Sequence, residues 1–91
     1  MSFPVGGSPR GYEQVTGLSV VKMLTVPASA GRAQIAVSGQ GVRYRDDGVD
    51  PDGTTGFPLA AGTEFVYAGN IRNLRFIQVA ASAVLDVLYY Q

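Results

Sequence analysis

The densest run of apolar side chains lies near the C-terminal end of the chain, between Leu74 and Tyr90. Two apolar runs, L-R-F-I-Q-V-A and A-V-L-D-V-L-Y-Y, flank the small pair Ala81-Ser82. Many of their larger residues are β-branched or aromatic, which favours pleated strands over a helix. The pattern therefore predicts an antiparallel hairpin that turns at Ala81-Ser82 and places Phe76 opposite Val87.

Such a hairpin has two faces of different character. We predict that the face without charges points to the core; it carries Leu74, Phe76, Gln78, Ala80, Ala83, Leu85, Val87 and Tyr89. The mixed face carries Arg75, Ile77, Val79, Val84, Asp86, Leu88 and Tyr90. On that mixed face Arg75 would lie diagonal to Asp86 and within its reach.

Shorter alternating segments precede this hairpin, separated by turn residues. The strongest pair, Ala33–Ser38 and Val42–Arg45, flanks Gly39-Gln40-Gly41 and predicts a second hairpin. Further strands are expected at residues 12–16, 18–26 and 63–68, with Lys22 breaking the apolar face of the segment 18–26 unless a bulge restores it. Residues 57–59 are expected to re-enter the core after the loop that precedes them. About seven or eight short strands with regular turns indicate an all-β fold, a single antiparallel β-sandwich or small jelly-roll-like barrel.

The first eleven residues, M-S-F-P-V-G-G-S-P-R-G, are rich in proline and glycine and predict an extended N-terminal arm. We therefore divide the chain into an arm over residues 1–11 and one β domain over residues 12–91. Phe3 and Val5 give the arm apolar side chains to bury, either on its own domain or on a neighbouring subunit.

Composition narrows the possible functions. Charged residues are only 15% of the 91, and there is no cysteine, histidine or tryptophan. Disulfides, thiolate nucleophiles, zinc–sulfur sites and imidazole catalysis are therefore absent. The low charge fits either a merely neutral surface or packing against other subunits. The N-terminus does not read as a signal peptide, and no apolar run is long enough to cross a bilayer.

Charge is balanced overall and uneven along the chain. Residues 1–45 carry five basic and one acidic side chain, a net charge of +4, while residues 46–91 carry two basic and six acidic ones, a net charge of −4. This arrangement permits complementary patches between copies of the protein. It lacks the clustered basic excess of a nucleic-acid binder.

The acidic stretch D-D-G-V-D-P-D-G-T-T-G at residues 46–56 is the one candidate for chemistry. If Gly53 takes the glycine position of a calcium-binding EF-hand loop, the first ligand position falls on Gly48 and the last on Leu59. Both are unsuitable, which leaves either a looser calcium site or aspartates that cap local backbone amides. No aromatic platform is expected beside these acids, so a glycosidase or any other enzyme is disfavoured, and no cofactor or metal is expected.

Several exposed positions suggest a protein interface. Arg43 and Arg45 are expected to form ion pairs with Asp46 and Asp47 at the rim of the domain. Tyr89 is expected inside and Tyr90 outside, since neighbouring residues of a strand face opposite ways. The residues proposed for the interface are Phe3, Val5, Arg10, Arg43, Arg45 and Tyr90.

The second half of the chain resembles small proteins encoded among the structural genes of tailed bacteriophages. The resemblance rests on V-R-Y-R-D-D-G at residues 42–48, G-F-P-L-A-A-G at 56–62, and the C-terminal L-R-F-I-Q-V-A-A-S-A-V-L-D-V-L-Y-Y. It implies a non-enzymatic virion subunit, assembled in the host cytoplasm, that decorates and stabilises the capsid surface. It also implies the major capsid protein or other virion proteins as partners, without nucleic acid or membrane.

The resemblance further suggests a homo-oligomer, for which a trimer is one option. Head–tail or tail-associated accessory subunits belong to the same group and form the first alternative. A carbohydrate-binding β-sandwich for host attachment is the second, although the absence of tryptophan counts against it. A minor metal-binding or catalytic module at the acidic stretch is the third.

Overall fold

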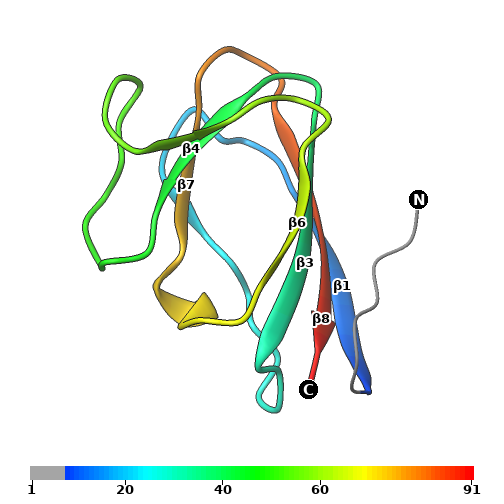
Figure 1. Ribbon diagram of the computed structural model, residues 1–91. Coiled ribbons are helices and arrows are strands. Elements are labelled where there is room, and N and C mark those ends of the chain that lie inside the picture. The colour runs from blue at the N-terminus through cyan, green and yellow to red at the C-terminus, as the bar shows by residue number, and fades with distance from the viewer. Residues whose placement is uncertain (1–7) are drawn as a thin grey trace.

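The computed structural model describes residues 8–91, which form two four-stranded antiparallel sheets (Figure 1). Phe3 and Val5 lie outside the described residues. The strands are β1 (Pro9–Val15), β2 (Lys22–Met23), β3 (Arg32–Ser38), β4 (Val42–Arg45), β5 (Phe57–Leu59), β6 (Glu64–Tyr67), β7 (Arg75–Gln78) and β8 (Val84–Tyr90). The helical content of the described part is one 3-10 turn, η1 (Ile71–Asn73), so the predicted all-β class is confirmed.

The strand order is β1-β8-β3-β6 in one sheet and β2-β7-β4-β5 in the other. Strands from the two halves of the chain pair in reverse order: β1 with β8, β2 with β7, β3 with β6, and β4 with β5. Two more pairs, β3 with β8 and β4 with β7, complete the sheets. The described strands form two open sheets and not a closed barrel, and Figure 1 shows the β4–β7 layer beside the β1–β8–β3–β6 layer.

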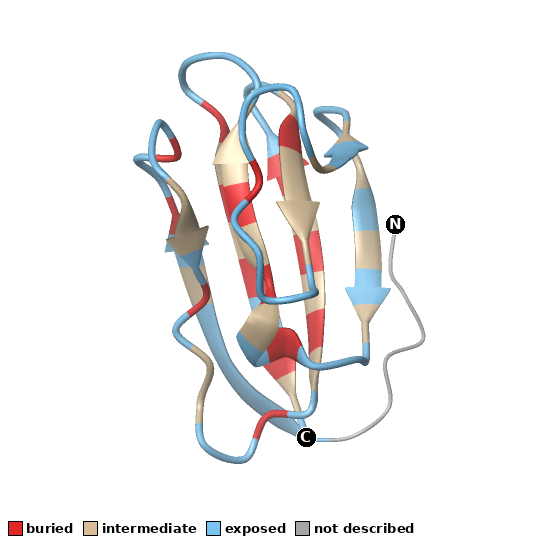
Figure 2. Cartoon of the chain, turned by 90° about the vertical axis from the view of Figure 1, so that its left-hand side faces the viewer, coloured by how far each residue is buried: buried red, intermediate tan, exposed pale blue. Residues whose placement is uncertain are grey.

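Both sheets contribute side chains to one hydrophobic core. Along β3 and β8 every second residue is buried, as the banded strands of Figure 2 show. Tyr89 and Phe76, the largest fully buried side chains, come from different sheets. The buried cluster comprises Val15, Leu18, Leu24, Ala30, Ala33, Ile35, Val37, Val42, Ile71, Leu74, Phe76, Ala83, Leu85, Val87 and Tyr89. Alternation explains the strand members of this cluster, because each strand turns one face toward the opposite sheet. Leu18, Leu24, Ala30, Ile71, Leu74 and Ala83 join it from loops and from η1.

The predicted C-terminal hairpin is wrong. β7 and β8 lie in different sheets, where Phe76 is opposite Tyr44 and Val87 is opposite Ile35. The prediction failed because a short turn reverses the chain equally well within a sheet or between two sheets. The predicted inward face still holds for six of its eight residues, whereas Gln78 is half-buried and Ala80 is exposed.

The predicted diagonal contact between Arg75 and Asp86 fails with the hairpin. Arg75 instead contacts Asp50, with 2.7 Å between Nη1 and Oδ1. Asp86 accepts hydrogen bonds from the Tyr12 hydroxyl and the Gln14 amide, at 2.6 and 3.2 Å.

The predicted hairpin around Gly39-Gln40-Gly41 is also wrong, although both of its strands exist. β3 belongs to the first sheet and β4 to the second, so this turn also crosses between the sheets. It lies beside the β7–β8 crossing, where the Val79 amide donates to the Gly41 carbonyl at 2.9 Å. Gly39 has a φ of 77°, and a Cβ there would collide with the Ser82 carbonyl oxygen.

Two predicted boundaries near the N-terminus need correction. β1 begins at Pro9, so the arm boundary drawn after Gly11 falls inside a strand. The pairing with β8 shifts between Pro9 and Gly11, and this irregularity lets an edge strand include proline and glycine. The strand expected over residues 18–26 shrinks to Lys22–Met23, since the chain turns at residues 18–20 with Leu18 buried and Val20 exposed.

Candidate functional site

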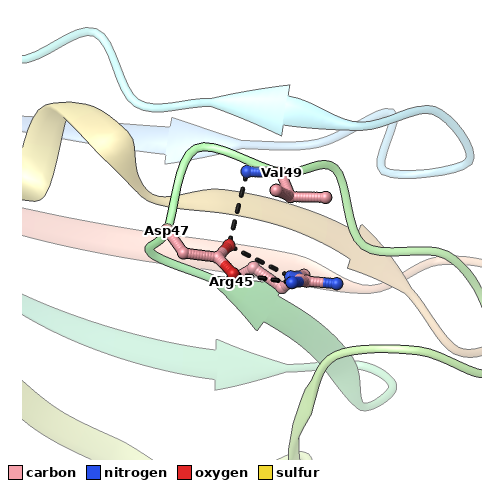
Figure 3. Close-up of polar contacts among 3 residues, drawn as sticks. All are labelled: Arg45, Asp47 and Val49. Atoms are coloured by element: carbon pink, nitrogen blue, oxygen red, sulfur yellow. Dashed lines mark hydrogen bonds and ion pairs between the residues drawn. The ribbon is translucent and has the colours of Figure 1, made fainter.

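The acidic loop at residues 46–56 is fastened to the outer side of the β2-β7-β4-β5 sheet by arginines. Arg45 holds Asp47 with two parallel hydrogen bonds, 3.1 Å from Nε to Oδ1 and 2.6 Å from Nη2 to Oδ2 (Figure 3). Arg43 on the same strand donates to the carbonyls of Gly53 and Gly56, at 3.3 and 3.0 Å. The loop therefore covers part of its own sheet.

The predicted rim ion pairs are partly confirmed. Arg45 does pair with Asp47, and its guanidinium lowers the pKa of that carboxyl from 3.8 to about 2. Arg43 contacts backbone carbonyls rather than a carboxylate. These contacts are largely solvent-exposed, so they orient the loop more than they stabilise the fold.

The aspartates also cap local backbone amides, as one alternative for the loop predicted. Asp52 Oδ1 accepts from the backbone amides of Thr54 and Thr55, at 2.8 and 2.7 Å. Asp47 Oδ1 accepts from the Val49 amide at 3.3 Å (Figure 3). The bonds from Thr54 and Thr55 lower the pKa of Asp52, because they stabilise its charged form. Across residues 8–91 no cluster of three or more potential metal-ligating side chains occurs.

An open pocket of about 420 Å³ lies between the start of this loop and its return into β5. Its lining combines two aromatic residues with charged ones: Tyr44, Arg45, Asp46, Asp47, Gly56 and Phe57. Phe57 is 63% exposed, the most exposed large hydrophobic residue in the described chain. The expectation that no aromatic platform accompanies the acids is therefore wrong.

Tyr44 connects this exposed ring to the core. Its ring meets Phe57 edge-on, with centroids 5.6 Å apart and an angle of 60° between the planes. It also stacks against Phe65 at 6.0 Å and against the buried Phe76 at 5.8 Å. One side of Phe57 therefore contacts Tyr44, whose own ring packs on the buried Phe76.

Gly56 and Asp46 complete the pocket wall. A Cβ on Gly56 would lie 3.0 Å from the Pro51 Cβ and 3.1 Å from the Arg43 Cβ, so a side chain there would require these neighbours to shift. Asp46 Oδ2 accepts a hydrogen bond from the Tyr67 hydroxyl at 2.6 Å. That bond raises the pKa of Tyr67 to about 12. Burial, followed by the charge of Asp46, raises the pKa of Tyr44.

A second candidate surface is the end of the molecule where four loops meet, at the top of Figure 1. We call this set, residues 16–21, 39–41, 60–63 and 79–83, the uncharged loop end, since it contains no charged residue. The Val79 amide joins two of these loops by donating to the Gly41 carbonyl at 2.9 Å. The other two loops are held by strand residues beside the set: the Gln78 amide donates to the Leu18 carbonyl at 2.9 Å, and the Gly62 amide donates to the Val37 carbonyl at 2.7 Å. Val20 and Val79 are 58% and 52% exposed there, while Lys22 and Glu64 directly follow two of the loops.

Comparison with known proteins gives no further identification: no protein-family profile, characterised protein or solved structure matches the chain. Among the described residues, no helix has the length and hydropathy that a membrane span requires.

Among the described residues, the four proposed for an interface lie on two different sheets. Arg10 and Tyr90 lie on the β1-β8-β3-β6 sheet, where Arg10 donates to the Gln91 side chain at 2.8 Å. Arg43 and Arg45 lie on the other sheet and hold the acidic loop. Tyr89 is buried as expected, and its neighbour Tyr90 is half-buried. The interface role of these residues stays a prediction.

Sequence reasoning missed Phe57 and Tyr44 as pocket residues. The signal was present, because Phe57 directly follows the acidic loop and Tyr44 lies two positions before its first residue. Both were read only as core-facing residues. The uncharged loop end was missed for a different reason: its four segments are far apart in sequence, and the crossings between sheets bring them together.

Proposed function

We propose that this protein is a non-enzymatic structural subunit of a tailed-bacteriophage virion that binds and stabilises the capsid surface. The sequence resemblance of residues 42–90 to small phage structural proteins supports this proposal. The first alternative within the same class is an accessory subunit of the head–tail junction or tail.

The strand order supports a jelly-roll interpretation of the fold. Orders β1-β8-β3-β6 and β2-β7-β4-β5 follow if a long antiparallel hairpin, with its tip between β4 and β5, is rolled into two sheets. Jelly rolls occur in viral capsid proteins, but also in lectins and cupins. The fold is therefore compatible with a virion role, and function must be argued from a surface.

The observation that carries the proposal is the uncharged loop end. Charged residues are depleted at the centres of protein interfaces, whereas polar residues surround them. Residues 16–21, 39–41, 60–63 and 79–83 carry no charge, Val20 and Val79 are exposed among them, and Lys22 and Glu64 lie in sequence at their border. A surface of this composition suits docking on a protein lattice, with each copy making the same contact.

Binding to purified phage heads tests this proposal. Val79→Glu places a charge in the uncharged loop end, and we expect it to weaken co-sedimentation with heads by at least about tenfold. Met23→Glu is the matched control, because Met23 is 50% exposed but lies on β2 in a sheet edge. It should bind heads as the unmodified protein does.

Three results bear on the proposal. Equal binding by Val79→Glu and the unmodified protein would exclude the uncharged loop end as the docking surface. Binding to purified tails but not to heads would favour the accessory-subunit alternative. Binding to neither particle would contradict a virion role.

A further inference from the structure

The pocket beside the acidic loop has features of a ligand site that a docking subunit does not need. Phe57 is 63% exposed, and its ring meets Tyr44 edge-on with centroids 5.6 Å apart. Gly56 lines the pocket at a point where a Cβ would crowd the Cβ atoms of Pro51 and Arg43. The backbone at Gly56 and the rings of Tyr44 and Phe57 therefore shape the pocket.

Polar groups around this ring remain available. Asp46 Oδ2 is engaged by Tyr67, while Oδ1 has no hydrogen-bond partner within residues 8–91. Arg45 uses Nε and Nη2 to hold Asp47, and within the same residues its Nη1 has no partner. The pocket thus offers one anionic acceptor and one cationic donor beside an exposed aromatic face.

We propose that this pocket binds a neutral carbohydrate residue. A sugar ring has a face of C–H bonds that can lie on an aromatic ring, whose face carries partial negative charge. Its hydroxyl groups both donate and accept hydrogen bonds, so neighbouring hydroxyls can contact Asp46 Oδ1 and Arg45 Nη1 together. Apolar lining with a few directed polar groups is typical of small-ligand sites.

Other ligand classes fit less well. A cationic group would gain from Asp46 and the rings but would also approach the Arg45 guanidinium. An anion would meet Asp46 and Asp47, and Asp47 already neutralises Arg45. A neutral polyhydroxylated ring meets neither repulsion.

The position of the pocket is compatible with the proposed docking on the capsid. Sugar binding by the pocket does not itself depend on that docking. The pocket lies at the end of β4 and the start of β5, whereas the uncharged loop end follows β5 and precedes β4. The pocket shares no lining residue with the uncharged loop end, so docking through those loops would leave the pocket residues outside the contact. Such docking, which rests on the proposed function, would present sugar-binding sites on the virion surface.

The test is an amide chemical-shift titration of the isolated, isotope-labelled protein with the methyl glycosides of glucose, galactose and mannose. At least one glycoside should shift the amides of Asp46, Gly56 and Phe57 with millimolar affinity. Phe57→Ala should weaken that affinity about tenfold, whereas Phe57→Trp, which keeps an aromatic face, should retain it. Asp46→Asn should weaken binding severalfold, since a neutral amide is the poorer acceptor.

Val79→Ala is the control for truncating an exposed apolar residue, because Val79 is 52% exposed and belongs to the uncharged loop end. It should leave glycoside affinity unchanged. The proposal is overturned if no glycoside shifts these amides, if Phe57→Ala binds as tightly as the unmodified protein, or if lysine amide binds more strongly than every glycoside. Because no particle is present, failure here leaves the head-binding result unaffected.

Discussion

At the scale of single residues, tyrosine hydroxyl groups donate hydrogen bonds to acidic side chains that are distant in sequence. The Tyr89 hydroxyl donates to Glu13, and the Glu13 carboxylate also accepts from the Thr25 amide at 2.7 Å. Tyr67 donates to Asp46 at the edge of the pocket. Burial and the bond to Glu13 raise the pKa of Tyr89 above its ordinary value. In each case the folded protein favours the protonated phenol.

This preference predicts a loss of stability in alkaline solution. The pKa of Tyr67 is about 12 in the folded protein against 10.0 ordinarily, so its contribution is complete below pH 10 and is lost as the pH rises toward 12. The unfolding free energy from urea titrations should therefore fall over this range. Tyr67→Phe should fall less steeply, and an identical slope for the two proteins would show that the Asp46 bond contributes nothing.

At the scale of elements, the alternation of apolar and polar residues could be predicted from the sequence, and the pairing of strands could not. Ile35 and Val37, or Leu85 and Val87, face the core because neighbouring strand residues point in opposite directions. The turns at 39–41 and 79–83 look like hairpin turns locally, but each joins two sheets. Each strand instead pairs with strands distant in sequence, β3 with β6 and β8, and β4 with β7, and a turn carries no local signal of such pairing.

The acidic loop shows the same division between local and distant information. Its turns and the capping by Asp52 follow from nearby residues, as predicted. Its attachment through Arg75 and Asp50 joins residues that are 25 positions apart and needed the structure. The aromatic lining of the pocket was in principle accessible, because Tyr44 and Phe57 border the loop in sequence.

Gly56→Ala tests how the loop is seated. Its φ of 140° and the crowding by Pro51 and Arg43 should make alanine destabilising by about 1–3 kcal/mol. Gly53→Ala is the matched control in the same loop, because a Cβ there meets nothing within 4 Å, and it should change stability by less than about 0.5 kcal/mol. Thermal or urea unfolding compares the two variants, and equal effects would contradict the close seating of Gly56.

At the scale of the whole molecule, the two candidate surfaces divide the protein by direction along the strands. The crossings between sheets gather uncharged segments at one end, with Val20 and Val79 exposed. Charged groups concentrate elsewhere, above all in the acidic loop and the arginines that hold it. The fold thus separates a set of uncharged loops from the acidic loop, in which Asp47 and Asp50 pair with Arg45 and Arg75.

The central claim, docking through the uncharged loop end, is tested most directly by hydrogen–deuterium exchange of the subunit free and bound to phage heads. Binding should slow amide exchange in residues 16–21, 39–41, 60–63 and 79–83, because docking removes those backbone groups from water. Exchange in the acidic loop at 46–56 should stay unchanged. Slower exchange confined to that loop or to the outer faces of the sheets, with the uncharged loop end unaffected, would contradict the claim.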